Sequence, residues 1–202
     1  MAGVRQFDED AVLDKALVVF WQRGYADATM QELAAATGVQ RGSLYNAYGD
    51  KETLFLRVFD RYRNRFIGEA RRALAHPDLR NALTGFFDYL IASMTLGTPR
   101  RGCLSTKTAL GGGNCIDPAI RKTLAGLIDE QEQMFRDRIA AADPAELGHV
   151  PPAQAAQVLI TFMRGLVVIE RIYQDTDRLR ESVQSLLDAL LAPRADAARA
   201  AA

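Results

Sequence analysis

Side chains able to bond nucleic acid are concentrated in one short stretch of the sequence, Gln40-Arg-Gly-Ser-Leu-Tyr-Asn46. If this stretch is a helix with Leu44 facing inward, its outer face carries Gln40, Arg41, Ser43, Tyr45 and Asn46. Amide, guanidinium and hydroxyl groups are the donors and acceptors that read base edges and hold phosphates. The stretch therefore predicts a surface that recognises double-stranded DNA.

A second short helix must precede this one to hold it in place. Thr29 and Glu32 have the spacing of a capping box, in which each side chain bonds the other residue's backbone N–H. The helix they begin ends near Gly38, a small turn residue of the kind that joins the two helices of a helix-turn-helix. Four apolar side chains face inward across the pair: Leu33, Ala34, Val39 and Leu44.

The motifs in this region resemble the N-terminal signature of the TetR family of regulators. After the capped helix come Ala-x-x-x-Gly-Val, Gly-Ser-Leu-Tyr and Tyr-Gly-Asp-Lys-Glu-x-Leu-Phe, in the order and spacing of that signature over about residues 8–60. The local string Gly102-Cys103-Leu104 also resembles one branch of the family. The resemblance implies an all-α homodimer that binds operator DNA and is regulated through its C-terminal domain.

Individual roles follow from the resemblance, position by position. Gln40 and Arg41 would reach base edges, and Lys51 would clamp a phosphate. Ser43, Tyr45 and Tyr48 would bond phosphates or pack on the sugar backbone, Thr29 would offer its hydroxyl and the helix N-terminus to a phosphate, and Asn46 has a less defined contact. Two alternatives stay open: Tyr45 could pack under the helix pair, and Arg41 could be a solvated surface charge.

Turn residues and a 3.6-residue apolar period predict about nine helices and no strand. They are expected at about 8–23, 29–37, 40–47, 51–74, 79–96, 102–110, 117–141, 153–173 and 179–191. With the resemblance, they divide into a helix-turn-helix DNA-binding domain of residues 1–52, a regulatory and dimerisation domain of residues 53–192, and a flexible tail of residues 193–202.

Composition excludes several other classes of protein. The formal net charge is zero, so any DNA binding must be local, and we expect only moderate salt dependence. Two cysteines and two histidines, without metal-ligand spacing or a catalytic constellation, predict neither a metal site, a cofactor nor an enzyme. The sequence has no apolar run of about 18 residues, so we expect no membrane-spanning helix. We also expect no signal peptide, and therefore predict a cytoplasmic protein.

The eighth predicted helix is apolar nearly all round, and the ninth carries an apolar stripe. A helix of that kind is buried on two sides, so both helices are expected to form a four-helix dimer interface with a second copy. The alternative is a core helix of a monomer. The expected interface residues are Val158, Phe162, Ile169, Val183, Leu186, Leu187 and Leu190.

A cavity for an apolar or aromatic inducer is expected among the middle helices, although such side chains are also ordinary core residues. Its candidate lining is Phe86, Phe87, Leu90, Met94, Cys103, Met134, Phe162, Met163 and Leu166. Cys103 has a second possible role. It follows Arg100 and Arg101 and begins a helix, a setting that makes a thiol reactive, with Cys115 as a resolving thiol. The alternative is that both cysteines are small buried fillers.

Two classes of function remain after these arguments. The favoured one is a transcription regulator, in the commoner family role of repressor, that binds a palindromic operator as a homodimer and is released by a small apolar ligand. A variant of it senses oxidants or electrophiles through Cys103. The other class is a helical small-molecule carrier without DNA binding, which would have no use for the side chains from Gln40 to Lys51.

Overall fold

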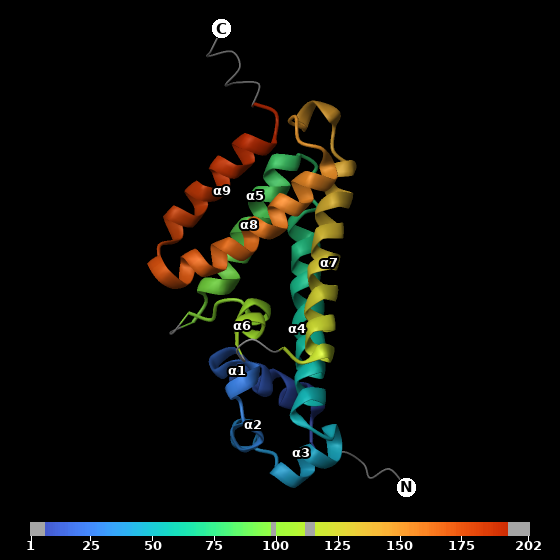
Figure 1. Ribbon diagram of the computed structural model, residues 1–202, viewed down its shortest axis with the longest axis vertical. Helices are drawn as coiled ribbons and strands as arrows, with labels where there is room; N and C mark the ends of the chain where they lie inside the picture. Colours follow the sequence, from blue (N-terminus) through green and yellow to red (C-terminus); the bar gives the residue numbers. More distant parts are fainter. Residues whose placement is uncertain (1–6, 98–99, 112–115, 194–202) are drawn as a thin grey trace. The chain divides into compact units, whose positions relative to one another are not determined.

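The computed structural model describes residues 7–97, 100–111 and 116–193, and within these ranges the secondary structure is helical apart from one isolated bridge, Leu147–Leu191 (Figure 1). The predicted tail lies outside them from residue 194 onward. The helices are α1 (Glu9–Asp27), α2 (Met30–Thr37), α3 (Arg41–Tyr48), α4 (Lys51–Ala73), α5 (Leu79–Thr95), α6 (Leu104–Leu110), α7 (Pro118–Ala140), α8 (Pro152–Tyr173) and α9 (Thr176–Leu190), with a 3-10 turn η1 (Pro144–Glu146). The all-α prediction is confirmed.

The chain forms two compact units, which are described separately. The first unit consists of Met1–Phe66 and Cys103–Gly126, and the second of Ile67–Gly102 and Leu127–Ala202. Both α4 and α7 begin in the first unit and end in the second. This division places α6 with α1, α2 and α3, whereas the predicted domain boundary after residue 52, which follows the family pattern, stays a prediction.

Aromatic packing holds the first unit together. Phe20 of α1 lies edge-on to Phe55 of α4 with ring centroids 5.0 Å apart, and Phe55 contacts Phe59 at 5.6 Å; none of the three rings is exposed. Burying rings of this size contributes a few kcal/mol each. At the same junction Arg61 of α4 donates to Asp14 of α1 at 2.9 Å, so the two helices are joined by apolar packing and an ion pair.

Several helix ends differ from the sequence-based expectation. The first helix does not stop at residue 23: Gly24 takes φ 79° and ψ 172°, which interrupts the helix, and one more turn follows to Asp27. The ninth helix begins at Thr176, earlier than predicted, because Asp175 accepts hydrogen bonds from the N–H groups of Asp177 and Arg178. The cap formed by Asp175 accounts for the earlier start of the ninth helix.

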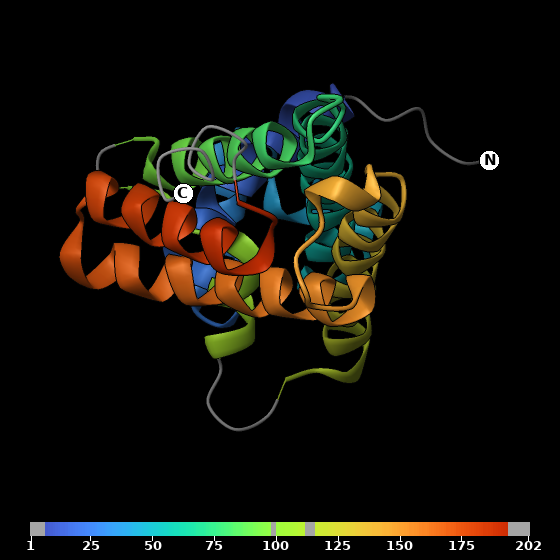
Figure 2. The same cartoon turned by 90° about the horizontal axis from the view of Figure 1, so that it is seen from above.

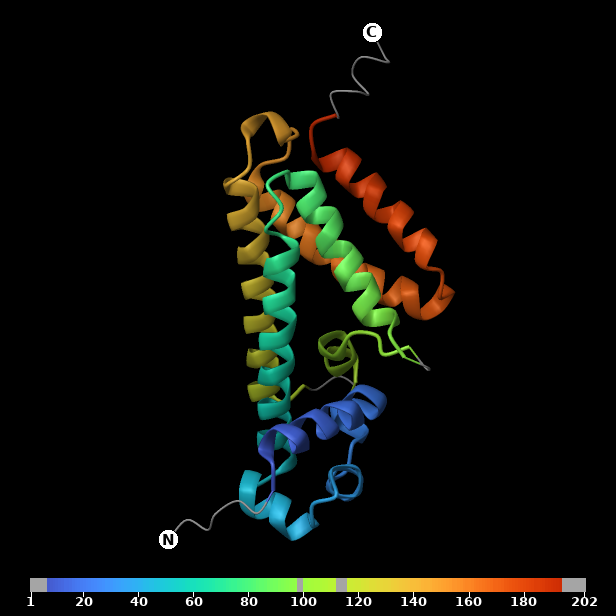
Figure 3. The same cartoon turned by 180° about the vertical axis from the view of Figure 1, so that it is seen from behind.

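In the second unit, α5 packs against both α8 and α9, and α8 packs against α9 (Figure 2 and Figure 3). The segment after α7 fastens the ends of these helices. Glu146 accepts the N–H of Leu79 at 2.7 Å, and the backbone near Gly148 lies so close to α9 that a Cβ there would meet the Leu190 carbonyl oxygen at 2.5 Å. A glycine is therefore required at this contact for steric reasons.

Among the described residues, one helix, α8, is long and apolar enough to cross a membrane by length and composition alone, although Arg164 interrupts its apolar run. Its inner side is packed within the second unit, where Met163 and Leu166 are buried. Glu170, also buried, is paired with Arg100 at 3.0 Å. A core helix of a helical bundle has the same composition, because it is apolar on the sides that its neighbours cover.

Candidate nucleic-acid interface

The first helix of the predicted helix-turn-helix begins as expected. Thr29 Oγ1 accepts the N–H of Glu32 at 3.2 Å, and Glu32 Oε2 accepts the N–H of Thr29 at 3.0 Å, which completes the capping box. The helix ends at Gly38, whose φ of 74° and ψ of 12° are left-handed. A glycine adopts this conformation without steric cost, so the chain can turn directly into α3.

The second helix of the pair presents the predicted polar face to solvent. Leu44 is fully buried against the first unit. The exposed side chains of the segment are Gln40, Arg41, Ser43, Tyr45 and Asn46. The Arg41 guanidinium lies over the Tyr45 ring, 5.5 Å from its centroid, which restrains both side chains on the outer face. Tyr45 is 38% exposed, so it does not pack under the helix pair.

Tyr48 does not belong to this face, and here the prediction is corrected. Its side chain is only 5% exposed, and its ring packs beside that of Phe7 with centroids 6.5 Å apart. It lies four residues after Leu44, on the same inner side of the helix. A ring in this position supports α3 from within the unit and cannot lie along a sugar backbone.

Lys51 is also engaged differently from the predicted phosphate clamp. Its ammonium donates to the carbonyl oxygens of Tyr25 at 2.9 Å and Ala26 at 3.1 Å, and it lies 4.6 Å from the centre of the Tyr25 ring. A cation suits this place because the last turn of a helix carries unpaired carbonyl groups. Lys51 therefore holds the end of α1 in this structure.

Charges around this lysine are unfavourable for a phosphate. The pKa of Tyr25 is raised, first by burial and then by the carboxylates of Glu52, Asp117 and Asp50. Burial, followed by Asp117, also raises the pKa of Glu52. The carboxylate charge beside Lys51 opposes the approach of another anion.

Two further cations of the first unit bond the protein's own acceptors near the interface. Arg23 pairs with Glu32 at 3.2 Å and so reaches the capping box of α2 from the end of α1. Lys107 of α6 donates to the carbonyl oxygens of Trp21 at 2.5 Å and Gln22 at 3.1 Å. A bond between residues 85 or more positions apart leaves no local pattern in the sequence. The Lys107 contact could therefore not be predicted.

The predicted inducer residues of α5, α7 and α8 lie together in the second unit. Phe86 lies 4.8 Å from Phe135 and Phe87 lies 5.8 Å from Phe162, centroid to centroid. Buried members of the predicted set are Phe86, Phe87, Leu90, Met94, Met134, Met163 and Leu166, and Phe162 is half-buried. Cys103 belongs to the first unit, where Ser105 Oγ and the Tyr62 hydroxyl are 3.0 Å and 3.9 Å from its sulfur.

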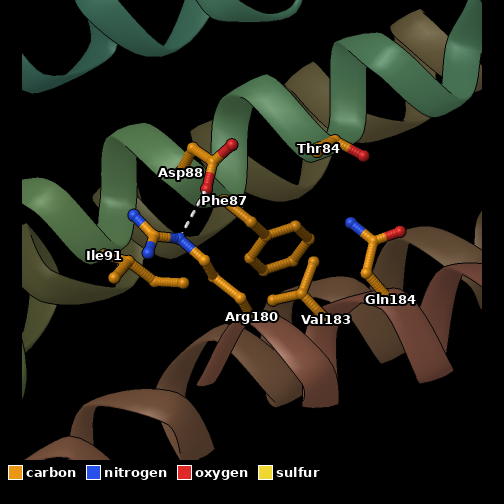
Figure 4. A pocket seen from close by; sticks show the side chains of 7 residues that line it. All are labelled: Thr84, Phe87, Asp88, Ile91, Arg180, Val183 and Gln184. Carbon is orange, nitrogen blue, oxygen red and sulfur yellow. Dashed lines mark hydrogen bonds and ion pairs between the residues drawn. The ribbon is translucent and has the colours of Figure 1, made fainter. Parts of the chain in front are cut away.

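A cavity of about 220 Å3 opens between α5 and α9, and it shares only Phe87 with the predicted lining. Figure 4 shows its wall, with the apolar side chains of Phe87, Ile91 and Val183 beside the polar side chains of Thr84, Asp88, Arg180 and Gln184. Arg180 donates to Asp88 at 3.4 Å along one side. This is smaller than the roughly 300–1,000 Å3 of a drug-sized site.

The expected dimer residues divide between two faces. Val183, Leu187 and Leu190 are buried in the chain's own core, because this side of α9 packs on its neighbours, so the prediction is corrected for these three. Val158 is 40% exposed, and Phe162, Ile169 and Leu186 are half-buried. Residues at helical spacing continue the exposed apolar side of α8: Val158, Gly165, Val168 and Ile172.

The described residues contain no group of three or more His, Cys, Asp or Glu side chains that could hold a metal ion. Cys115, the proposed resolving thiol, lies outside the described ranges.

Comparison with known proteins places this geometry in a family. Residues 12–58 match the model for bacterial regulatory proteins of the tetR family. The chain is 37% identical over 99 residues to the transcriptional repressor ComR of Escherichia coli, an alignment that covers 48% of this chain and 47% of ComR. It is 26% identical over 196 residues to the transcriptional regulator YezE of Bacillus subtilis, covering 94% of this chain and all of YezE.

Solved structures extend the likeness over nearly the whole chain. A cysteine-substituted TetR family regulator, CifR, complexed with 26-bp operator DNA, is 31% identical with a TM-score of 0.80, covering 93% of this chain and 99% of that one. NemR of Escherichia coli shares the fold, with a TM-score of 0.82 at 17% identity, covering 92% of this chain and 97% of that one. The chain therefore belongs to the TetR family and is a DNA-binding transcription regulator, not an enzyme.

Proposed function

We propose that this regulator is a repressor that binds a palindromic operator as a homodimer in the cytoplasm and is released by a small apolar ligand. The observation that carries the proposal is the exposed outer face of α3, where Arg41 stacks on Tyr45 above a buried Leu44. Relatives described as repressors, ComR and DhaR, support the sign of regulation. A helical carrier would have no reason to hold this polar face rigid.

Direct base reading falls to the start of α3. Gln40 is the N-cap residue and its side chain is not used in capping, so its amide is available to a base edge. Arg41 follows it on the exposed face and can bond a guanine through two donors. Ser43, Tyr45 and Asn46 would hold the flanking sugar-phosphate backbone, and Thr29 would present the N-terminus of α2 to a phosphate.

Two copies are needed because half-sites of a palindrome lie about one helical turn, roughly 34 Å, apart. The outer side of α8 is the surface we assign to the contact between them. It is apolar from Val158 to Ile172, and Gly165 has open space where a Cβ would be, so a second helix can approach closely. A twofold contact would bring the same stripe of each copy together.

The released state requires a ligand that prefers one conformation of the protein over the other. The aromatic cluster of α5, α7 and α8 and the cavity between α5 and α9 are both lined by Phe87. Their apolar surfaces suit a small compound with one ring and few charges. A ligand in either place would compete with DNA through the coupling free energy between the two sites.

A second candidate signal is oxidation of Cys103. The favouring observation is the position of its sulfur, half-buried beside two hydroxyl groups at the start of α6. Among relatives, CifR has been solved with cysteines substituted and NemR in a reduced form. Hydrogen peroxide would form a bond between one oxygen and the Cys103 thiolate, the O–O bond would break, and the second oxygen would leave as hydroxide.

The first prediction concerns Arg41. Arg41→Ala is expected to weaken binding to an operator, selected from random DNA, by about 5- to 150-fold for each half-site, since one bidentate pair is worth roughly 1–3 kcal/mol. Gel-shift titration measures it, and Arg121→Ala, which removes an exposed arginine of α7, is the control. Equal affinity of the Arg41→Ala variant and the parent would contradict the proposed reading face.

The second prediction distinguishes two roles for Lys51: bonding the end of α1 and binding a DNA phosphate. Lys51→Met is expected to lower the unfolding free energy by about 1 kcal/mol, because a charged donor to two carbonyl groups is lost from a half-exposed site. The slope of log affinity against log salt should not change. A slope reduced by about 0.9 for each subunit with unchanged stability, the signature of one lost phosphate contact per subunit, would restore the phosphate clamp.

The dimer surface is tested with a charge at its centre. Val168→Glu is expected to raise the dimer dissociation constant more than about 100-fold, because two unpaired carboxylates would be buried across the twofold axis at several kcal/mol. Sedimentation equilibrium reports the change. Leu110→Glu, at a side chain that is 73% exposed, should leave the constant as it is. A dimeric Val168→Glu protein would place the interface elsewhere.

The thiol candidate makes its own prediction. Peroxide treatment should reduce operator affinity of the parent protein, whereas Cys103→Ser should bind operator normally before and after treatment. Mass spectrometry of the treated parent identifies the oxidised residue. An unchanged affinity of fully oxidised parent protein would exclude sensing by Cys103.

A further inference from the structure

The backbone of α1 is interrupted at Gly24. In an unbroken helix the carbonyls of Trp21 and Gln22 would accept the N–H groups of Tyr25 and Ala26, four residues on. The ψ of 172° at Gly24 is extended and directs the following backbone out of the helical path. Carbonyls beside such an interruption can accept hydrogen bonds from side chains elsewhere in the chain.

Lys107 of α6 supplies the donor. Its ammonium lies 2.5 Å from the Trp21 oxygen and 3.1 Å from the Gln22 oxygen. Its stem fits the break as well, because Cγ and Cδ would be 3.7 Å and 3.8 Å from a Cβ placed on Gly24. A cation at the negative end of a helix is also favoured by the helix dipole.

Lys51 repeats this arrangement a few residues later. Its ammonium holds the carbonyls of Tyr25 and Ala26. Lys107 of α6 therefore bonds carbonyls just before Gly24, and Lys51 of α4 bonds two carbonyls of the short turn from Tyr25 to Asp27 that follows it. Only Ala28 separates this turn from Thr29, the N-cap of α2.

We propose that Lys107 is a positioning residue for DNA reading, through which α6 sets the orientation of α1's last turn and thus of α2 and α3. All the contacts that carry this proposal lie within the first unit. It rests on the proposed reading of DNA by α3.

The decisive comparison is between three lysine variants and the parent. Lys107→Met keeps most of the stem but loses the ammonium, and it is expected to bind the selected operator about tenfold more weakly, about 1.4 kcal/mol. The salt slope should stay unchanged, because Lys107 bonds carbonyl groups and not phosphate. Lys107→Arg should restore most of the affinity. Lys122→Met, at an exposed lysine of α7, is the matched control.

Hydrogen exchange distinguishes positioning from general stability. In Lys107→Met without DNA, the amides of residues 25–33 should exchange faster while those of the α4 core keep the parent's protection. Parent-like affinity, unchanged exchange at residues 25–33, or a salt slope reduced by about 0.9 for each subunit would each overturn the proposal. If Lys107→Met does not fold, Lys107→Gln takes its place, and failure of both to fold would also overturn a local role.

Comparison with Arg41→Ala distinguishes failure of the Lys107 proposal from failure of the proposed DNA reading by α3. If Arg41→Ala and Lys107→Met both bind like the parent, α3 is not the reading helix and both proposals fail. If Arg41→Ala is defective and Lys107→Met is not, only the role of Lys107 fails.

Discussion

An interrupted helix, α1, leads into the helix-turn-helix of this regulator, and we propose that the position of the DNA-reading face depends on it. Gly24 interrupts α1 one turn before its end, and backbone carbonyls on both sides of the interruption accept hydrogen bonds from side chains. Two lysines from distant parts of the chain, Lys107 and Lys51, supply the donors. Only two residues separate α1 from α2, so under our proposal the same bonds would set the position of the helix-turn-helix.

The chain has no net charge, and several of its cations bond acceptors within the protein and do not form a basic surface for DNA. Several cations of the first unit are bound to the protein's own acceptors: Arg61 to Asp14, and Arg23 to Glu32. The pKa of Asp14 is lowered by its hydrogen bond from Arg61, as expected for a carboxylate held in its charged form. Arg41 is arranged differently, exposed and stacked on a tyrosine. Affinity would then come from a few placed groups and not from bulk charge.

In the second unit, one apolar surface is buried within the chain and another is exposed. The stripe of α9 that includes Val183 and Leu187 is buried within the chain, while the outer side of α8 keeps Val168 and Ile172 exposed. An inner and an outer apolar side on adjacent helices allow one chain to fold alone and still present a surface to a second copy. The glutamate Glu170, buried and paired with Arg100, lies near the end of the same helix.

Local interactions were readable from the sequence by itself. The capping box, the glycine turn at Gly38 and the polar outer face of α3 each depend on residues within a few positions of one another, so spacing alone determines them. The helix order and the all-α class follow from periodicity for the same reason. The positive φ at Gly24 was also predictable, because glycine tolerates it, although the turn that follows was not.

Only the tertiary structure decided which side chains on those elements are available. Tyr48 has a polar group and stands in a polar stretch, yet it lies four residues after Leu44 and is buried with it. The partners of Lys51 and Lys107 are 25 to 86 residues away, and no local pattern encodes such bonds. The stripe on α9 was visible in sequence, but the helix that covers it was not, because an apolar face specifies burial without specifying the neighbour that provides it.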